Sequence, residues 1–178
     1  MKLVLIGTDH RLQQSVVQDE RTKVWLRRDG GHRYRKLIVY CIEKLSVKAV
    51  LEETHPNQEQ TAPTIASVVA KERGLVWQTL GLGEIALEDA LLDPPLAEAI
   101  RSKVKPELLA GVYVLDTHKA RERFMHTTIM EAMREHSCVL AIVGYVHLGV
   151  LARIFEADQI PVKALLFTYP LVIDEKRS

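Results

Sequence analysis

The chain has 178 residues, of which 47% are hydrophobic and 26% charged, with a formal net charge of +1. These values are typical of one globular domain with a substantial core, and the near-neutral charge argues against general nucleic-acid binding. There is no run of the roughly 20 apolar residues that a membrane span needs, no signal-peptide pattern, and only two cysteines. We therefore expect a cytoplasmic protein that does not cross a membrane and whose two thiols are free and buried.

Two apolar runs carry the same spacing of glycine and histidine. The first, KLVLIGTDH, contains Gly7 and His10, and the second, VLAIVGYVH, contains Gly144 and His147. Continuous aliphatic runs of this length predict strands that are buried on both faces, as in parallel sheets. We interpret the two glycines as the points where each strand ends and the backbone turns. The two histidines would then lie just past the carboxyl ends of the strands, at the edge where open α/β sheets bind ligands.

The pattern along the whole chain predicts an alternation of helices and strands. The expected elements are a short helix or loop over 11–28, a helix over 34–45, a strand over 47–53, a helix that ends at Gly74, a strand over 75–80, short helices within 81–115, a helix over 116–136, a strand over 139–143, a helix over 148–155 and a strand over 162–167. Such alternation implies right-handed crossovers. We predict one α/β domain over 1–178: a three-layer, mostly parallel sheet of about five strands with helices on both faces, and a small helical cap over about 81–115.

The second strand ends in two glutamates, Glu52 and Glu53. Successive side chains of a strand point to opposite faces, so only one of the two can face the site. Glu52 shares a face with Val50 and is favoured for this reason. The alternative is that one glutamate is a solvated residue at the start of the next segment. A buried carboxylate would need a partner, because an unpaired buried charge is costly.

The helix over 116–136 carries an arginine at an unexpected position. Its apolar stripe consists of Met125, Ile129, Ala132 and Met133. A step of four residues back from Met125 leads to Arg121, and three more lead to His118. We therefore expect Arg121 on the core-facing side near the start of the helix. The alternative is that its side chain extends past the sheet into solvent.

These positions place two imidazoles, a carboxylate and a guanidinium at one edge. A histidine oriented by Glu52 can act as a general base on water, and a second histidine with Arg121 can stabilise an oxyanion. The set His10, Glu52, Arg121 and His147 therefore favours hydrolysis of a carbonyl or related electrophile. The set His10, Glu52 and His147 could instead hold a divalent metal such as Mn, Zn or Co, with His55 as a further candidate ligand.

The ordered motifs resemble a known superfamily, which joins TraB/GumN, TIKI, ChaN-like and erythromycin-esterase-like proteins. GTDH, VLEE, RERFM and VGYVHLG follow its pattern of G-x-x-H, a strand-end Glu, R-[DE]-x-x-M and a second G-x-x-H. The matching residues are Gly7, His10, Glu52, Arg121, Glu122, Met125, Gly144 and His147. The resemblance implies an α/β fold in which these residues line one cleft. The candidate substrate-binding residues at this edge are Gly7, Asp9, Glu53, His118, Gly144 and Tyr145.

Members of this superfamily differ in function. TIKI proteins resemble metal-dependent peptidases, other members are metal-free esterases that use His and Glu, and ChaN-like proteins bind haem. The chain is short and lacks the TraB membrane helices and the large esterase insertions. The leading prediction is a small hydrolase acting on a small-molecule substrate. The alternative is a ligand-binding protein for haem or another planar ligand, with Tyr145 as an axial ligand; the aromatic content of 6% makes haem the less favoured cofactor.

A basic segment precedes and opens the helix over 34–45. It consists of Arg27, Arg28, His32, Arg33, Arg35 and Lys36. Such a segment is either a solvated surface or, with the free N–H groups of the helix start, a phosphate site for an anionic substrate. Because the expected cap is small, a second copy of the chain could complete the cleft as a homodimer.

Overall fold

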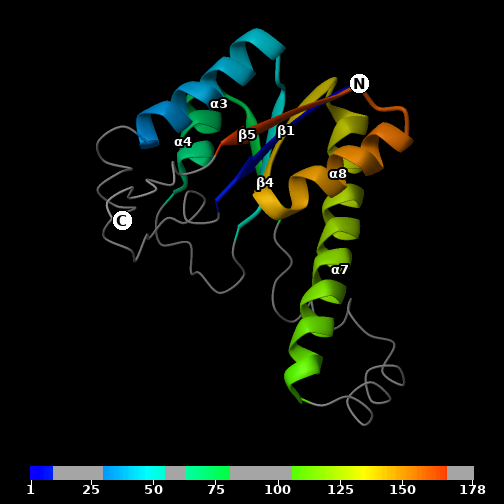
Figure 1. The fold of residues 1–178 in the computed structure, drawn as a ribbon. Helices are drawn as coiled ribbons and strands as arrows, with labels where there is room; N and C mark the ends of the chain where they lie inside the picture. Colours follow the sequence, from blue (N-terminus) through cyan, green and yellow to red (C-terminus); the bar gives the residue numbers. More distant parts are fainter. Residues whose placement is uncertain (10–29, 55–62, 81–105, 168–178) are drawn as a thin grey trace, which may run out of the picture.

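The computed structural model describes residues 1–9, 30–54, 63–80 and 106–167; of residues 106–118 and 120 it describes the backbone (Figure 1). The elements in these ranges are β1 (Lys2–Thr8), α3 (Gly31–Leu45), β2 (Ala49–Glu52), α4 (Ile65–Glu72), β3 (Val76–Thr79), α7 (Pro106–Glu135), β4 (Cys138–Gly144), α8 (Tyr145–Ala157) and β5 (Val162–Phe167). The five strands form one all-parallel sheet in the order β3-β2-β4-β1-β5. The predicted α/β fold is therefore confirmed.

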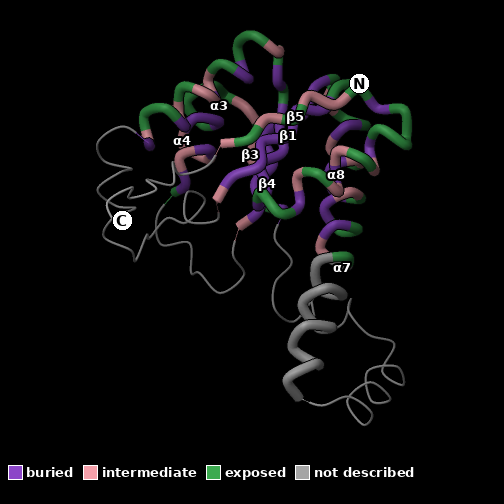
Figure 2. Tube along the Cα trace, viewed as in Figure 1, coloured by how far each residue is buried: buried purple, intermediate pink, exposed green. Residues whose placement is uncertain are grey.

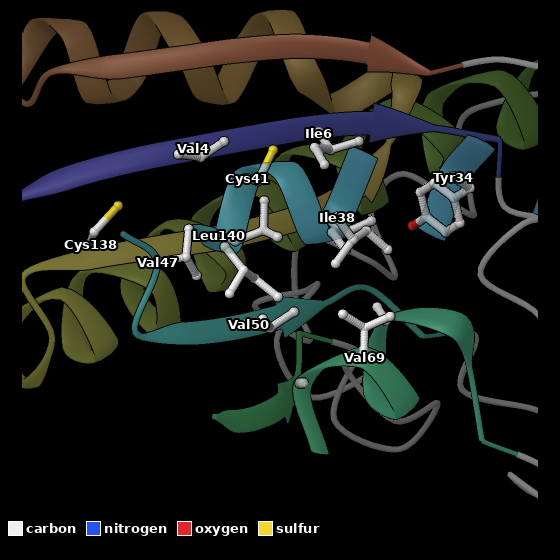
Figure 3. Packing of buried hydrophobic residues seen from close by; sticks show 14 residues of the cluster. Val4, Ile6, Tyr34, Ile38, Cys41, Val47, Val50, Val69, Cys138 and Leu140 are labelled. Atoms are coloured by element: carbon white, nitrogen blue, oxygen red, sulfur yellow. The ribbon is translucent and has the colours of Figure 1, made fainter. Parts of the chain in front are cut away.

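The central strands are buried on both faces, because side chains alternate along a strand and helices cover each side. In β1, Val4 and Ile6 pack with α3 and α4, whereas Leu3 and Leu5 pack with α7 and α8. Figure 2 shows the buried strands in the middle of the molecule. The predicted three layers are thus formed by α3 and α4, the sheet, and α7 with α8. Both cysteines are free and buried, and Cys41 belongs to the cluster under α3 (Figure 3).

Gly7 allows a close contact between two elements. A Cβ atom at this position would lie 2.7 Å from Cδ2 and 2.9 Å from Cβ of Leu148, so a residue without a side chain is needed for α8 to pack this near β1. The strand continues past Gly7 to Thr8. The prediction that Gly7 ends its strand is therefore wrong, whereas Gly144 is the last residue of β4 and caps α8.

Three helices begin earlier than the sequence pattern predicted. α3 begins at Gly31 rather than at residue 34. α7 begins at Pro106, so residues 106–115, which we expected in the cap, belong to one continuous helix. Proline is well suited to the first helical position, where its missing N–H would have no partner. α8 begins at Tyr145, and His147 therefore lies in its first turn. The rest of the expected cap, 81–105, and the segment 11–28 lie outside the described residues.

The helix α4 ends as its sequence predicted, through Gly74. This residue has φ +64°, its N–H donates to the carbonyl of Lys71 (3.1 Å), and the N–H of Leu75 donates to that of Ala70 (2.9 Å). These two bonds form a Schellman motif.

None of the described helices is long and apolar enough to span a membrane.

The topology reverses around β4. This strand lies between β1 and β2, and it leads into α8 on one face of the sheet. The next described helices after β1 and β2 are α3 and α4, which cover the other face (Figure 1). Loops that leave neighbouring strands toward opposite faces open a crevice at the carboxyl edge, where ligands bind in such folds. The candidate residues are found at this edge.

Candidate functional site

His147 lies between two carboxylates at the carboxyl edge of β4. Its side chain is 1% exposed, its Nδ1 is 3.1 Å from Oε1 of Glu122, and its Nε2 is 3.7 Å from Oε1 of Glu53. The first contact is a hydrogen bond, and the second is longer than one. An ionised carboxylate only accepts, so the bond to Glu122 places the imidazole proton on Nδ1. Nε2 faces Oε1 of Glu53.

Glu53 is held in place by the backbone of β4. Its N–H donates to the carbonyl of Ile142 (2.8 Å), and its Oε2 accepts from the N–H of Gly144 (2.6 Å). The first bond extends the β2–β4 ladder by one residue, and the second turns the carboxylate over the end of β4. Glu53 is 4% exposed. One of its oxygens is therefore oriented by the fold, and the other faces His147.

Glu122 reaches the site from the buried stripe of α7. It is 8% exposed, and Met125, Ile129 and Met133 continue the same stripe. Arg121, which we expected on this stripe, is only partly buried. At 3.6 residues per turn, a stripe can be extended backward by three or by four residues, and the contact with His147 selects Glu122. The structure thus brings Glu122 to His147, and the predicted role of Arg121 in the site stays a prediction.

Glu52 lies on the opposite face of the sheet from this centre. It follows Val50 on the face covered by α3 and α4, and it is 0% exposed. Its Oε2 accepts hydrogen bonds from Thr64 Oγ1 (2.5 Å) and Trp77 Nε1 (3.0 Å). Burial raises the pKa of Glu52 to about 7, although these two hydrogen bonds lower it. The structure thus brings Glu53 to His147, and Glu52 to a separate group of neutral donors.

The structure gives less information about the other predicted site residues. His10, His55, Arg27 and Arg28 lie outside the described residues, and His118 lies where the backbone of α7 alone is described. Tyr145 is 53% exposed at the start of α8, and Asp9 is partly buried after β1. In the basic segment, Arg35 forms an ion pair with Glu72 of α4, so this side chain ties two helices together.

The described residues contain no group of three or more His, Cys, Asp or Glu side chains arranged to hold a metal ion. In the predicted set of metal ligands, Glu52 and His147 lie toward opposite faces, and the third member, His10, is not described. Sequence reasoning gave Glu122 no catalytic or binding role, although this residue matches the R-[DE]-x-x-M motif. The signal was its position in RERFM, three residues before the buried Met125.

No family model matches the chain, and neither a curated protein nor a solved structure matches it. The candidate site therefore rests on the geometry of Glu53, Glu122 and His147.

Proposed function

We propose that the protein is a small hydrolase in which Glu122, His147 and Glu53 activate a water molecule against an ester or amide bond. The observation that carries this proposal is the position of the imidazole: Nδ1 is bonded to Glu122, and Nε2 is 3.7 Å from Glu53 Oε1. An imidazole oriented by one carboxylate, with its second nitrogen directed at the reacting group, is the arrangement of a general base.

In the proposed mechanism the nucleophile is a water molecule between His147 and Glu53. Because Nε2 and Oε1 of Glu53 are 3.7 Å apart, one water oxygen can lie at about 2.8 Å from both. As this water attacks the carbonyl carbon, Nε2 takes its proton, and the imidazolium is stabilised by Glu122 and Glu53. The same nitrogen then returns the proton to the leaving alcohol or amine, which breaks the scissile bond.

We propose a small substrate for this centre, in which the side chain of His147 is 1% exposed. Arg121, beside Glu122 on α7, and His10 stay candidates for stabilising the oxyanion. The resemblance to erythromycin-esterase-like and TIKI proteins supports hydrolysis as the reaction class.

The ligand-binding alternative has less support. Both imidazole nitrogens of His147 face carboxylates, so neither is directed at an iron atom, and the neighbouring Tyr145 is 53% exposed. An absorbance spectrum of the purified protein tests this alternative, because a haem protein has a Soret band.

The test of the hydrolase uses 4-nitrophenyl acetate and a panel of small esters and amides. Wild type is compared with His147→Ala, Glu122→Gln and Glu53→Gln, and with Glu156→Gln as the control, an exposed carboxylate on α8, the helix of His147. We expect each site variant to lose at least about 100-fold in kcat/KM, the range of a lost general base, and the control to keep its activity. A wild type without turnover on the whole panel, or folded site variants with full activity, would contradict the proposal.

A further inference from the structure

A cavity of about 280 Å³ lies between α7 and the β2–β3 side of the sheet. One wall is formed by residues of both strands, including Leu51 of β2 and Val76 of β3, and the other by the C-terminal part of α7. The volume is close to the lower limit of about 300 Å³ for pockets that bind small molecules. The cavity therefore has the size for a short-chain ligand.

The strand side of the cavity is apolar. Ala49 and Leu51 are each 1% exposed, whereas Val76 is 53% exposed. Val76 belongs to β3, an edge strand of the sheet, and its exposed fraction leaves apolar surface in contact with water. Ala132 of α7 adds a further apolar side chain to the lining. Covering this surface with the methylene groups of a ligand is favourable, because it removes apolar area from water.

The helix side of the cavity carries two carboxylates and a hydroxyl. Thr128, Glu131 and Glu135 follow one another at spacings of three and four residues, so they lie along one face of α7. Ala132 lies between the two glutamates on the same face. No lysine or arginine is among the described residues that line the cavity. This wall is therefore negatively charged and favours a cation.

These three polar side chains have no partners in the described part of the chain. Thr128 is only 7% exposed, and no hydrogen bond of the described residues includes its hydroxyl. A buried hydroxyl without a partner is costly, and native proteins leave few such groups. Glu131 and Glu135 take part in none of the ion pairs among the described residues, and like charges one helical turn apart repel each other. A ligand that donates hydrogen bonds and carries positive charge would satisfy all three.

We propose that this cavity binds a linear aliphatic diamine with both amino groups protonated. One ammonium group lies between Thr128 and Glu131, the other lies beside Glu135, and the methylene groups cover Ala132 and Val76. Glu131 and Glu135 are about 6 Å apart along the helix axis, which is similar to the separation of the two nitrogens in 1,4-diaminobutane. An ammonium group has three N–H donors and no acceptor, so it suits carboxylate and hydroxyl oxygens. A water molecule would satisfy Thr128 but would leave the two carboxylates unbalanced.

The cavity is separate from the proposed catalytic centre. None of Glu53, Glu122 and His147 lines it. Along α7, Glu131 follows Glu122 by nine residues, which corresponds to about 14 Å. The inference therefore does not rest on the proposed hydrolysis.

The test is isothermal titration calorimetry of the full chain with 1,4-diaminobutane at pH 7, in phosphate buffer without other amines. We expect a saturable heat, with one diamine bound per chain. 1-Aminobutane has the same carbon chain but one ammonium group, so it should bind at least about tenfold more weakly, the range of a lost hydrogen bond to a charged group. 1,4-Butanediol, which has no charge, should give no saturable heat at equal ionic strength.

Single substitutions locate the bound diamine. Glu131→Gln and Glu135→Gln change exposed residues, so both variants should fold. Each should weaken the binding of 1,4-diaminobutane at least about tenfold, because a charge-assisted hydrogen bond is lost. Thr128→Val keeps the shape of the side chain and removes the hydroxyl, so it should weaken binding about fivefold or more. Glu156→Gln, at an exposed carboxylate on α8, is the matched control and should bind as wild type does.

Three results would overturn the proposal. If 1,4-diaminobutane gives no saturable heat with wild type, or if 1-aminobutane binds equally tightly, the cavity is not a diamine site. If Glu131→Gln and Glu135→Gln bind the diamine as tightly as Glu156→Gln, the diamine binds elsewhere. The calorimetric titration does not depend on ester hydrolysis, so failure of this site and failure of the hydrolase are distinguishable.

Discussion

Glu52 and Glu53 are neighbours in the chain, but the sheet places them in two different environments. Glu53 faces an imidazole and accepts from the backbone N–H of Gly144, whereas Glu52 meets the neutral donors Thr64 and Trp77. Both carboxylates are buried. The difference shows that the partners on each face of the sheet, rather than burial alone, decide what a buried carboxylate can do. The end of β2 therefore presents one buried carboxylate to each face of the sheet.

The largest expected effect is a loss of esterase activity when a residue on the His147 face of the sheet is changed. Glu122→Gln replaces an acceptor-only carboxylate with an amide, which no longer selects the tautomer with the proton on Nδ1 of His147. We expect kcat/KM for 4-nitrophenyl acetate to fall by roughly 10²–10⁴-fold. An activity within a few-fold of the Glu156→Gln control would contradict the assigned role of Glu122.

The second prediction concerns the pH dependence of stability. The pKa of Glu52 is raised from 4.5 to about 7 in the folded state, so between these values the folded chain binds more protons than the unfolded chain. Stability from this group is therefore present at low pH and is lost as the pH rises, by about 3 kcal/mol in all. Glu52→Gln should remove this component.

Urea unfolding between pH 4 and pH 8, in buffers without amines, measures the effect. The unfolding free energy of wild type should fall relative to that of Glu52→Gln as the pH rises, because the glutamine stays neutral. Parallel curves for the two proteins would show that the pKa of Glu52 is not raised. Comparison with the variant cancels the titration of all groups that the two proteins share.

The third prediction concerns a substitution that disturbs the packing on the His147 face of the sheet. Gly7→Ala places a Cβ atom against Leu148, so α8 has to move away from β1. We expect a loss of about 1–3 kcal/mol in unfolding free energy, typical of overpacking, together with lower esterase activity. The Trp77 indole resonance, on the other face, should stay in place. The double variant Gly7→Ala, Leu148→Ala should recover activity relative to the single one; no recovery would mean that the contact with Leu148 is not the cause.

The smallest predicted effect is on the Glu52 face. Thr64 caps α4 by accepting from the N–H of Ser67 (3.0 Å), and it also donates to Glu52. Thr64→Val removes both bonds and should cost about 1–2 kcal/mol. Because the bond from Thr64 lowers the pKa of Glu52, that pKa should rise further in the variant. Thr64→Ser keeps the hydroxyl and should resemble wild type; an equal loss in both variants would exclude the hydrogen bonds as the cause.

The sheet was predictable because its central strands are continuous aliphatic runs, which have few alternatives in a chain of this length. β5 has the predicted bounds, Val162–Phe167. The alternation of side chains also showed that Glu52 and Glu53 point to opposite faces. It could not show which face holds the histidine, because β2 is buried on both sides and its pattern lacks a polar face.

Two further features of the site depend on choices that local patterns leave open. The stripe of α7 is compatible with Arg121 or Glu122, and only the packing of α7 against α8 decides between them. Gly7 follows an apolar run, as a residue that ends a strand would. Its role depends on the contact with Leu148, which is remote in sequence. The site is formed by such contacts between residues that are far apart in the sequence. The pattern of a single segment does not predict them.

The most direct test of the central claim compares two adjacent variants in one assay. Glu52→Gln and Glu53→Gln differ by one position, and both replace a buried carboxylate with an amide of the same shape. With 4-nitrophenyl acetate as substrate, we expect Glu53→Gln to lower kcat at least about tenfold more than Glu52→Gln, because Glu53 faces the base. An equal loss in both variants, or a larger loss in Glu52→Gln, would contradict the assignment of the two glutamates to separate centres.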